Sequence, residues 1–201
     1  MIDAKDWLEF GQKFHGHKCP AMPMGLRAAA AAMNALGVER TGDSALLSIV
    51  DLGVDHCATC YADGVQVITG STFGKGNIER TYKGKWALTL VDIPGKRAVR
   101  VVPKAQVMMQ TKESPFITEY RAKGVPPTQV PEEVSQPLVD KVMSMPDEAL
   151  LDISEVFDYE PELHPHTFNG FVCPECGEMV AETYGRIKNG TPVCIDCAAR
   201  P

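Results

Sequence analysis

The sequence predicts an α+β protein with a core domain of helices packed on an antiparallel sheet, over residues 1–165, and a small zinc-ribbon domain over residues 166–201. Two helical patterns open the chain, strand-like runs separated by turn signals occupy its middle, and two C-x-x-C pairs close it. Of the 201 residues, 44% are apolar and 23% are charged, an ordinary globular balance. One sizeable core is therefore expected, and the short terminal module needs another source of stability.

Two helices are predicted near the amino terminus. Residues 3–14 place three aromatic side chains at helical spacing, with Asp3 available as a cap. The stretch MGLRAAAAAMNALG predicts a second helix that begins after Pro23 and ends at Gly37. Because this helix is almost uncharged and its side chains are small, we expect it to be buried and tightly packed on a sheet or on a second copy of the chain.

Strands dominate the middle of the chain. Residues 44–52 read as a buried strand, and residues 57–68 have the apolar spacing of a helix. Three β-rich runs follow, separated by Lys-Gly and Pro-Gly turn signals, and are expected to form an antiparallel meander: 77–84, 85–93 and 96–103. Residues 104–151 look mainly helical, and the link to the terminal module is expected at residues 161–169.

Composition excludes several classes of protein. A net charge of −6 opposes long-range attraction to nucleic acid or anionic lipid. No run approaches 18 apolar residues, and the first residues mix acids and bases where a signal peptide needs a basic start and an apolar stretch. Seven cysteines, mostly in C-x-x-C spacing, favour metal or thiolate chemistry over extracellular disulfides. We therefore expect a soluble cytoplasmic protein, with no membrane segment and no nucleic-acid partner.

Charge is unevenly distributed along the chain. Residues 73–112 contain nine Lys or Arg against two acids, whereas residues 129–163 contain one Lys against ten acids. The two regions are expected to neutralise each other within the fold or across a dimer, an interpretation we prefer to an anion-binding face.

The terminal cysteines have the spacing C-x2-C-x17-C-x2-C, typical of a structural zinc site formed by Cys173, Cys176, Cys194 and Cys197. The intervening residues predict a hairpin that turns at Asn189-Gly190. Two disulfides are the alternative. Four thiolates leave no open position, which argues against catalysis at this ion. Residues 171–201 carry three bases and four acids, so a phosphate-binding face is not evident, and positioning a partner or stabilising a dimer is the role we favour.

A second group of metal-binding residue types lies near the amino terminus. His15, His17 and Cys19 form H-x-H-x-C, and in an extended segment alternate residues share a face, so the three converge on one ion such as zinc or a late first-row metal. Cys57 and Cys60 add a C-x-x-C at the start of a helix, with Asp63 one turn further. The alternatives are small buried thiols, a redox dithiol, and histidines bonded only to solvent or backbone.

The loop Gly70–Asn77, GSTFGKGN, resembles a phosphate cradle with its free amides, hydroxyls and lysine. It lacks the Walker spacing, and Gly76 stands where a Mg²⁺-binding hydroxyl is needed. A tight turn is preferred over a lining for an anionic ligand.

Together, FHGHKCPAMPMGLRAA, CYADGVQVITGSTFGKGN and the terminal four-cysteine module resemble the formylmethanofuran dehydrogenase E-subunit-like family over most of the chain. The resemblance implies a dimeric α+β core followed by a zinc ribbon, and a genomic link in some anaerobes to a molybdenum or tungsten enzyme. It nominates a metal or active-site group made of His17, Cys19 and Cys60. The surrounding residues that it implies are Asp63 and Gln66, with Thr72 and Lys75 as cofactor-binding candidates.

The chain also departs from the family pattern. Cys57 is additional, and Ser71 replaces a cysteine that family members often carry before the threonine of G-x-T. Any thiolate contribution from that loop is therefore missing here.

We predict a metal-binding protein with structural zinc in the ribbon and a second transition-metal ion at a His/Cys site, linked to redox or one-carbon metabolism through a molybdenum or tungsten enzyme. If the protein is an enzyme, His17, Cys19 and Cys60 would hold the catalytic ion, with Asp63 or His15 moving a proton. The alternative is a dimeric assembly or regulatory adaptor whose ribbon binds protein or nucleic acid. The sequence leaves open whether the protein catalyses a reaction.

Overall fold

The computed structural model describes residues 1–55, 59–162 and 167–201. The chain forms two compact units, Met1–Pro161 and Glu162–Pro201. The boundary predicted between residues 165 and 166 lies outside the described residues, as do His56 and Cys57.

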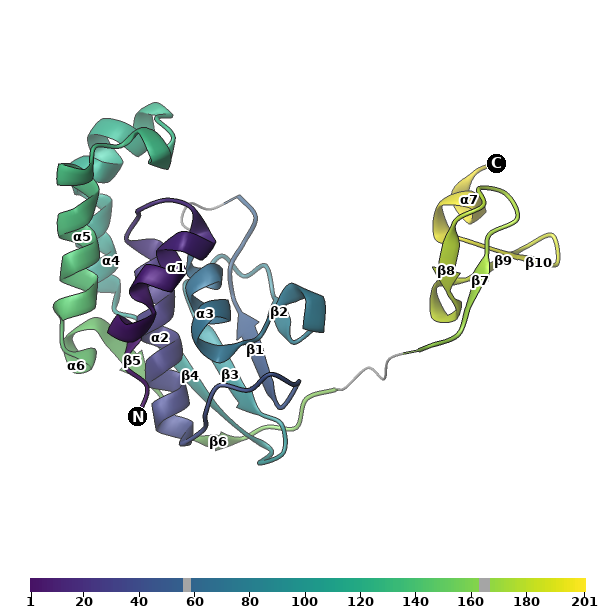
Figure 1. Ribbon diagram of the computed structural model, residues 1–201, viewed down its shortest axis with the longest axis horizontal. Helices are drawn as coiled ribbons and strands as arrows, with labels where there is room; N and C mark the ends of the chain where they lie inside the picture. Colours follow the sequence, from purple (N-terminus) through teal and green to yellow (C-terminus); the bar gives the residue numbers. More distant parts are fainter. Residues whose placement is uncertain (56–58, 163–166) are drawn as a thin grey trace. The chain divides into compact units, whose positions relative to one another are not determined.

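The first unit contains one mixed sheet of six strands in the order β2-β1-β3-β4-β5, with β6 also paired to β4 (Figure 1). The strands are β1 (Leu46–Val50), β2 (Ile78–Arg80), β3 (Leu88–Asp92), β4 (Arg97–Pro103), β5 (Leu151–Ile153) and β6 (Phe157–Asp158). Each neighbouring pair among β1, β3, β4 and β5 is antiparallel, with Leu90 opposite Val99 between β3 and β4.

The predicted three-run meander is wrong in its first member. Strand β2 runs parallel to β1, pairing Ser48 with Ile78, whereas only β3 and β4 form the expected hairpin. The reason is the helix between β1 and β2, since a crossover connection returns the chain in its original direction. A short strand-like run carries no signal of its direction, so the local pattern did not predict this pairing.

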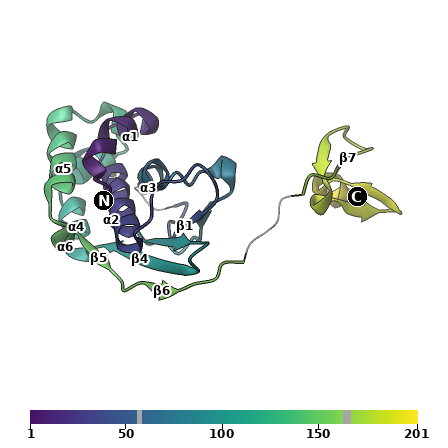
Figure 2. The same cartoon turned by 60° about the horizontal axis from the view of Figure 1, so that its bottom comes forward.

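The helices of the first unit are η1 (Ala4–Trp7), α1 (Leu8–His15), α2 (Ala21–Leu36), α3 (Tyr61–Thr69), η2 (Phe73–Lys75), α4 (Ala105–Lys112), the π-helical turn η3 (Phe116–Tyr120), η4 (Arg121–Lys123), η5 (Pro127–Gln129), α5 (Glu132–Ser144) and α6 (Asp147–Leu150). Figures 1 and 2 show α1, α2 and α3 together on one face of the sheet. None of the helices in the described ranges is long and apolar enough to cross a membrane.

Helix α2 is the centre of the core. It begins at Ala21, earlier than predicted, because Pro23 falls in the first turn, where no backbone N–H is needed. It ends as predicted at Gly37, which adopts φ +67°. Leu26 and Met33 are fully buried, as are three of the alanines between them, which confirms a buried helix packed on the sheet.

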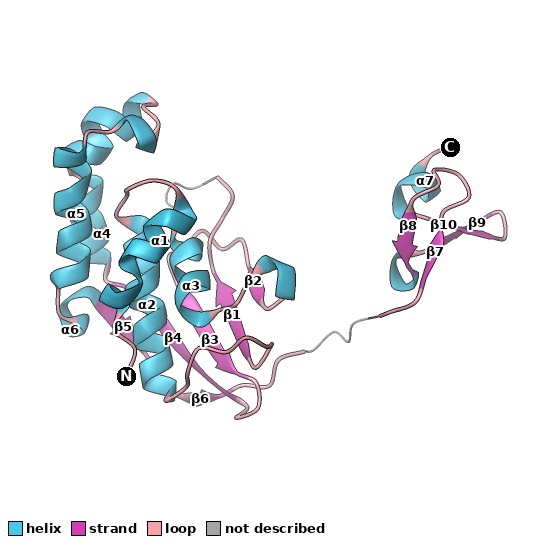
Figure 3. Cartoon of the chain, in the orientation of Figure 1, coloured by secondary structure: helices cyan, strands magenta, loops and turns pink. Residues whose placement is uncertain are grey.

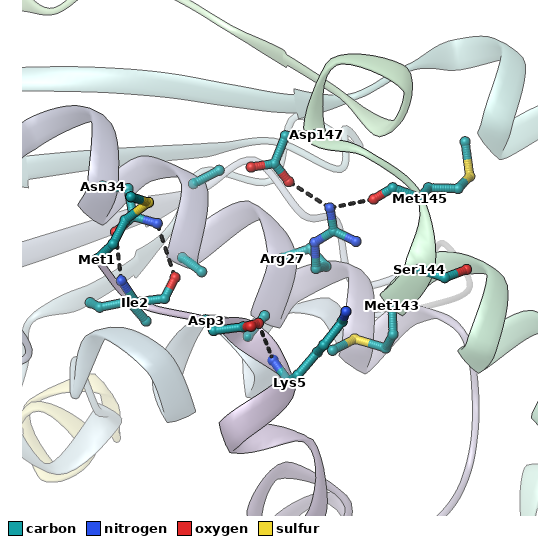
Figure 4. A pocket seen from close by; sticks show the side chains of 13 residues that line it. Met1, Ile2, Asp3, Lys5, Arg27, Asn34, Met143, Ser144, Met145 and Asp147 are labelled. Atoms are coloured by element: carbon teal, nitrogen blue, oxygen red, sulfur yellow. Dashed lines mark hydrogen bonds and ion pairs between the residues drawn. The ribbon is translucent and has the colours of Figure 1, made fainter.

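Helices α4 and α5 lie side by side beyond the β5 edge of the sheet (Figure 3). Arg27 of α2 holds this region in place: its guanidinium donates to the carbonyl oxygens of Val142 and Met145 and to Asp147, each at 2.6 Å. A hollow of about 350 Å³ lies beside this arginine (Figure 4). Because the arginine is already bonded to protein oxygens, we assign no ligand site to the hollow.

Two ion pairs join the oppositely charged regions of the sequence. Lys96 contacts Glu160 at 2.7 Å, and Lys104 contacts Asp152 at 2.8 Å. The predicted attraction is therefore confirmed within the fold. Both pairs are solvent-exposed, so each contributes little to stability.

The second unit is a small module of two hairpins and a short helix. Its elements are β7 (Gly170–Val172), β8 (Met179–Ala181), η6 (Glu182–Tyr184), β9 (Arg186–Lys188), β10 (Thr191–Val193) and α7 (Ile195–Ala199). The turn between β9 and β10 has positive φ at both Asn189 and Gly190, as the sequence predicted. Its buried cluster is centred on only three residues, Cys173, Val193 and Cys197.

Candidate metal centres

Four metal-binding side chains converge in the first unit. The ligand atoms of His15, His17, Cys19 and Cys60 all lie within 4.8 Å of one another. His15 ends α1, Cys19 lies just before α2, and Cys60 is the N-cap residue that directly precedes α3. The group predicted from His17, Cys19 and Cys60 is therefore assembled, with His15 as a fourth member.

The predicted extended backbone for His15–Cys19 is wrong at its start, because His15 is helical. Gly16 follows with φ +86°, and its N–H donates to the carbonyl oxygen of Gln12 at 2.9 Å. This left-handed cap turns the chain sharply, so that the His15 and His17 rings lie with centroids 4.0 Å apart. A helix end with a glycine turn thus brings the two histidines together.

A close crossing of α2 and α3 brings the cysteines together. A Cβ added to Gly64 would lie 2.2 Å from the carbonyl oxygen of Met22 and 2.5 Å from the amide nitrogen of Leu26. Only glycine permits this approach. Because the helices touch near their amino-terminal ends, Cys19 and Cys60 come within reach of each other.

The donor separations are close to those around one tetrahedral ion, although the shortest falls below the ideal range and the longest above it. Nε2 of His15 lies 3.0 Å from Nε2 of His17 and 3.6 Å from Sγ of Cys19, and Sγ of Cys60 lies 3.9 Å from Nε2 of His17. Zinc bond lengths to imidazole and thiolate predict donor separations of about 3.3–3.8 Å in a tetrahedron. Two imidazoles and two thiolates are also a donor set that zinc and related transition metals prefer.

Asp63 borders the group without belonging to it. Its Oδ2 accepts a hydrogen bond from Nδ1 of His15 at 2.7 Å, so the other nitrogen of that ring faces the remaining donors. Asp63 lies one helical turn after Cys60, which explains the three-residue spacing of the two residues in the sequence.

Protonation of the four side chains is strongly coupled. The hydrogen bond to Asp63, and next the Cys60 sulfur, raise the pKa of His15 to about 9. The Cys60 contact and the amides at the start of α2 lower the pKa of Cys19 to about 7, against the effect of burial. The Cys19 contact, followed by burial, raises the pKa of Cys60 to about 12. Burial and the neighbouring His15 lower the pKa of His17.

Sequence reasoning did not single out Arg121 or the ion pair of Lys18 with Glu132, which lie on this side of the unit. The charge of Arg121 adds to the lowering of the His17 pKa, although burial is the larger cause. The ammonium of Lys18 contacts Glu132 at the start of α5. Because these contacts join residues about a hundred positions apart, no local signal in the sequence could have found them.

The structure does not bring Thr72 and Lys75 to this group. They follow the carboxyl end of α3, whereas Cys60 lies at its amino end, and nine helical residues span about 13 Å. Thr72 accepts a hydrogen bond from the backbone N–H of Lys75 and caps η2. The predicted cofactor-binding role of both residues stays a prediction.

Ser71 lies in the core rather than at a surface. It is fully buried and accepts a hydrogen bond from Oγ of Ser48 at 2.9 Å, beneath α3. Asn77 extends this polar network by donating to the carbonyl oxygen of Leu46 and accepting from the N–H of Thr72. The loop GSTFGKGN is thus held to β1 by its own side chains.

The second unit contains the other candidate centre. The sulfurs of Cys173, Cys176, Cys194 and Cys197 lie within 4.8 Å of one another, with 3.9 Å between Cys176 and Cys194. The amide of Cys194 donates to Sγ of Cys173 at 3.4 Å and lowers the pKa of that thiol to about 6. These are the four cysteines and the hairpin predicted from the sequence, in the closed arrangement of a structural zinc site.

Both units match families of known proteins. Residues 14–152 match the family model described as "FmdE, Molybdenum formylmethanofuran dehydrogenase operon", and residues 167–201 match the prokaryotic dksA/traR C4-type zinc finger. The chain is 31% identical over 198 residues to a "Probable S-adenosyl-L-methionine-binding protein" of Archaeoglobus fulgidus. That match covers 93% of this chain and 51% of the relative, so the chain spans about half the length of that protein.

A solved structure has the same fold. The crystal structure of a tungsten formylmethanofuran dehydrogenase FmdE-like protein from Syntrophus aciditrophicus superposes with a TM-score of 0.66 at 21% identity, covering 98% of this chain and 92% of that one. With the family match over more than half of its length, the chain belongs to the FmdE family and carries a C4-type zinc finger at its carboxyl end.

Proposed function

We propose that this protein binds two metal ions, a structural zinc ion in the terminal module and a transition-metal ion, most suitably zinc, in the core. The observation that carries the core site is the convergence within 4.8 Å of four donors from two separate segments, one with His15, His17 and Cys19 and the other with Cys60. Two imidazole nitrogens and two thiolate sulfurs are a ligand set that zinc binds in four-coordinate tetrahedral sites.

A shared ion explains the close contacts among the His15, His17 and Cys19 donor atoms better than hydrogen bonds do. Nδ1 of His15 is committed to Asp63, so its Nε2 meets Nε2 of His17 at 3.0 Å and the Cys19 sulfur at 3.6 Å. Hydrogen bonding needs one proton between each such pair, and thiols are weak donors. One cation satisfies all four lone pairs at once and stabilises both thiolates.

We further propose that the ion at the core site takes part in a chemical reaction. Because four protein donors fill a tetrahedral shell, an ion held here polarises a carbonyl oxygen or activates water only if it takes a fifth ligand or one of the four donors leaves it. Asp63 is the proton-transfer candidate, since it borders the group and offers no ligand atom to it, whereas His15 is itself a ligand. The family description names molybdenum formylmethanofuran dehydrogenase, and the similar crystal structure is of a protein described as like a subunit of the tungsten enzyme. We propose that the chain acts as a homodimer or beside such an enzyme.

Metal analysis of the purified full chain tests the proposal. We expect two ions per chain, one after Cys19→Ser or Cys60→Ser, and one after Cys176→Ser. In the first two variants the ion that remains should be the ribbon ion, and in the third it should be the core ion. A single ion per chain that Cys19→Ser leaves unchanged would overturn the core site.

The adaptor alternative is supported by apolar side chains exposed on the second unit. Val172 and Met179 face each other across β7 and β8 with 62% and 73% of their surfaces exposed, and Ile187 is 74% exposed. Lys188 is occupied by Glu175 and by the Cys197 carbonyl oxygen, which leaves it less available to a phosphate. These features favour a protein partner for this unit, and a fluorescence titration with DNA at low salt should show no binding.

A further inference from the structure

We infer that Asp63 and Gln66 form a positioning relay that fixes His15 as the fourth ligand of the core ion. The inference deepens the metal binding proposed above and rests on it. Cys60, Asp63 and Gln66 follow one another at three-residue intervals, and only Cys60 offers a ligand atom to the metal-binding group. The inference gives the other two residues a role as well.

The relay is a chain of two hydrogen bonds. Nδ1 of His15 donates to Oδ2 of Asp63 at 2.7 Å, and Nε2 of Gln66 donates to Oδ1 of the same carboxylate at 3.3 Å. The His15 side chain is only 6% exposed, so water has little access to hold its ring. Both oxygens of Asp63 are thus engaged by protein donors, and the carboxylate has one preferred orientation.

The relay selects the histidine nitrogen that faces the centre. A neutral imidazole carries its proton on either nitrogen, and only the nitrogen without it can bind a metal. Asp63 keeps the proton on Nδ1, so the lone pair of His15 is on Nε2, the atom that lies near His17 and Cys19. A carboxylate on the outer nitrogen also makes the imidazole a stronger ligand.

Helix α3 supports this arrangement with one face. Cys60, Asp63 and Gln66 recur at every third residue, so their side chains follow each other along one side of the helix. The first binds the ion, the second orients a ligand that comes from α1, and the third orients the carboxylate. A purely structural ion pair between α1 and α3 would need neither the Gln66 contact nor the alignment with the other donors.

The test compares Asp63→Leu and Gln66→Leu with a matched control pair in the full chain. Gln136 donates to Asp140 at 2.7 Å on α5 and belongs to neither metal-binding group, so Gln136→Leu and Asp140→Leu remove the same chemistry elsewhere. Co²⁺ is the probe, because a site with two imidazoles and two thiolates has a different ligand-field spectrum from a four-thiolate site, and the two can be titrated separately.

We expect Asp63→Leu to weaken Co²⁺ binding at the core site by about 10- to 100-fold, and Gln66→Leu to weaken it by a smaller factor. Neither control variant should change it. Nitrogen chemical shifts of His15, recorded in the metal-free chain at a pH where the ring is neutral, should show the proton on Nδ1 in the wild type and a mixture of the two forms in Gln66→Leu. If Asp63→Leu does not fold, Asp63→Asn replaces it in the test, because asparagine keeps an oxygen acceptor and removes the charge.

Failure of the relay and failure of the metal site give different results. If Cys60→Ser loses the core Co²⁺ signal while the Asp63 and Gln66 variants keep wild-type affinity and the His15 proton position, the relay is wrong and the metal site stands. If Cys60→Ser also binds as the wild type does, the core metal site itself is wrong.

Discussion

Gly25 of α2 and Gly64 of α3 lie directly against each other where the two helices cross. A Cβ added to Gly25 would lie 3.2 Å from the Cα of Gly64 and 2.0 Å from the carbonyl oxygen of Tyr61. This contact places the start of α2 beside the start of α3, and therefore Cys19 beside Cys60. Two residues without side chains thus determine where the metal-binding side chains meet.

Replacing Gly25 by alanine should separate these helices. The new methyl group meets backbone atoms, which cannot move aside cheaply, so we expect a loss of about 3 kcal/mol or more in the free energy of unfolding. Both tryptophans lie in the first unit, so urea unfolding followed by tryptophan fluorescence reports on it. Gly74→Ala is the control, because its added Cβ has open space and should change stability by less than about 0.5 kcal/mol. Equal effects of the two changes would contradict the close crossing.

Removing metal should unfold the second unit and leave the first folded. The buried cluster of the second unit is centred on three residues, two of them cysteines of the proposed site, so ligation supplies most of its stability, on the order of 10 kcal/mol. Hydrogen exchange after chelation should show lost protection over residues 170–199 and retained protection over residues 21–36. Protection of 170–199 that persists in protein shown to be metal-free would refute this expectation.

Asp51 should make the stability of the first unit depend on pH. Its buried carboxylate accepts from Thr81 and Arg100, each at 2.6 Å, and lies 3.4 Å from Lys83. Burial acts to raise the pKa of Asp51, but Thr81 and Arg100 outweigh it and hold the pKa below its usual value. The ionised group therefore stabilises the fold above its ordinary pKa, and this contribution is lost as the pH falls through the lowered value.

We accordingly expect Asp51→Asn to cost about 2 kcal/mol at pH 7, a figure reduced because Arg100 is partly exposed. The difference from wild type should shrink toward pH 3, as measured by urea unfolding at both pH values. Glu160→Gln removes an exposed ion pair with Lys96 and should change stability by less than about 0.5 kcal/mol at either pH. A pH-independent cost of Asp51→Asn would show that its charge is irrelevant.

Ser71→Cys should not add a metal ligand, although family members often have cysteine there. The side chain lies in the core and bonds to Ser48, apart from the four-residue group. We expect an unchanged metal count, a thiol that alkylating reagents do not reach in the folded protein, and a loss of about 1 kcal/mol from the weakened hydrogen bond. A third bound ion, or alkylation as fast as that of metal-free Cys60, would place this residue near the surface.

Features that depend on neighbouring residues were predictable. The C-terminal stop at Gly37, the Asn189-Gly190 turn and the cysteine spacing of the terminal module each follow from a few adjacent side chains, and the structure confirms them. The direction of β2 and the helical conformation of His15 were not predictable in the same way. In both cases the local pattern suits more than one backbone path: the crossover through α3 sets the direction of β2, and the cap at Gly16 ends α1 after His15.

By itself, the sequence determined the amphipathic and buried helices, the strand-rich centre and the donor set of the zinc finger, because these depend on periodicity and on ligands held by one hairpin-linked module. The family resemblance had already grouped His17 and Cys19 with Cys60, which lies 41 residues beyond Cys19, but only the tertiary structure decided that His15 joins them. It also decided that Asp63 accepts a hydrogen bond from one of the histidines and that Thr72 caps a turn beyond the other end of α3. The physical reason is that such meetings depend on how closely α2 and α3 pack, which no stretch of local sequence specifies.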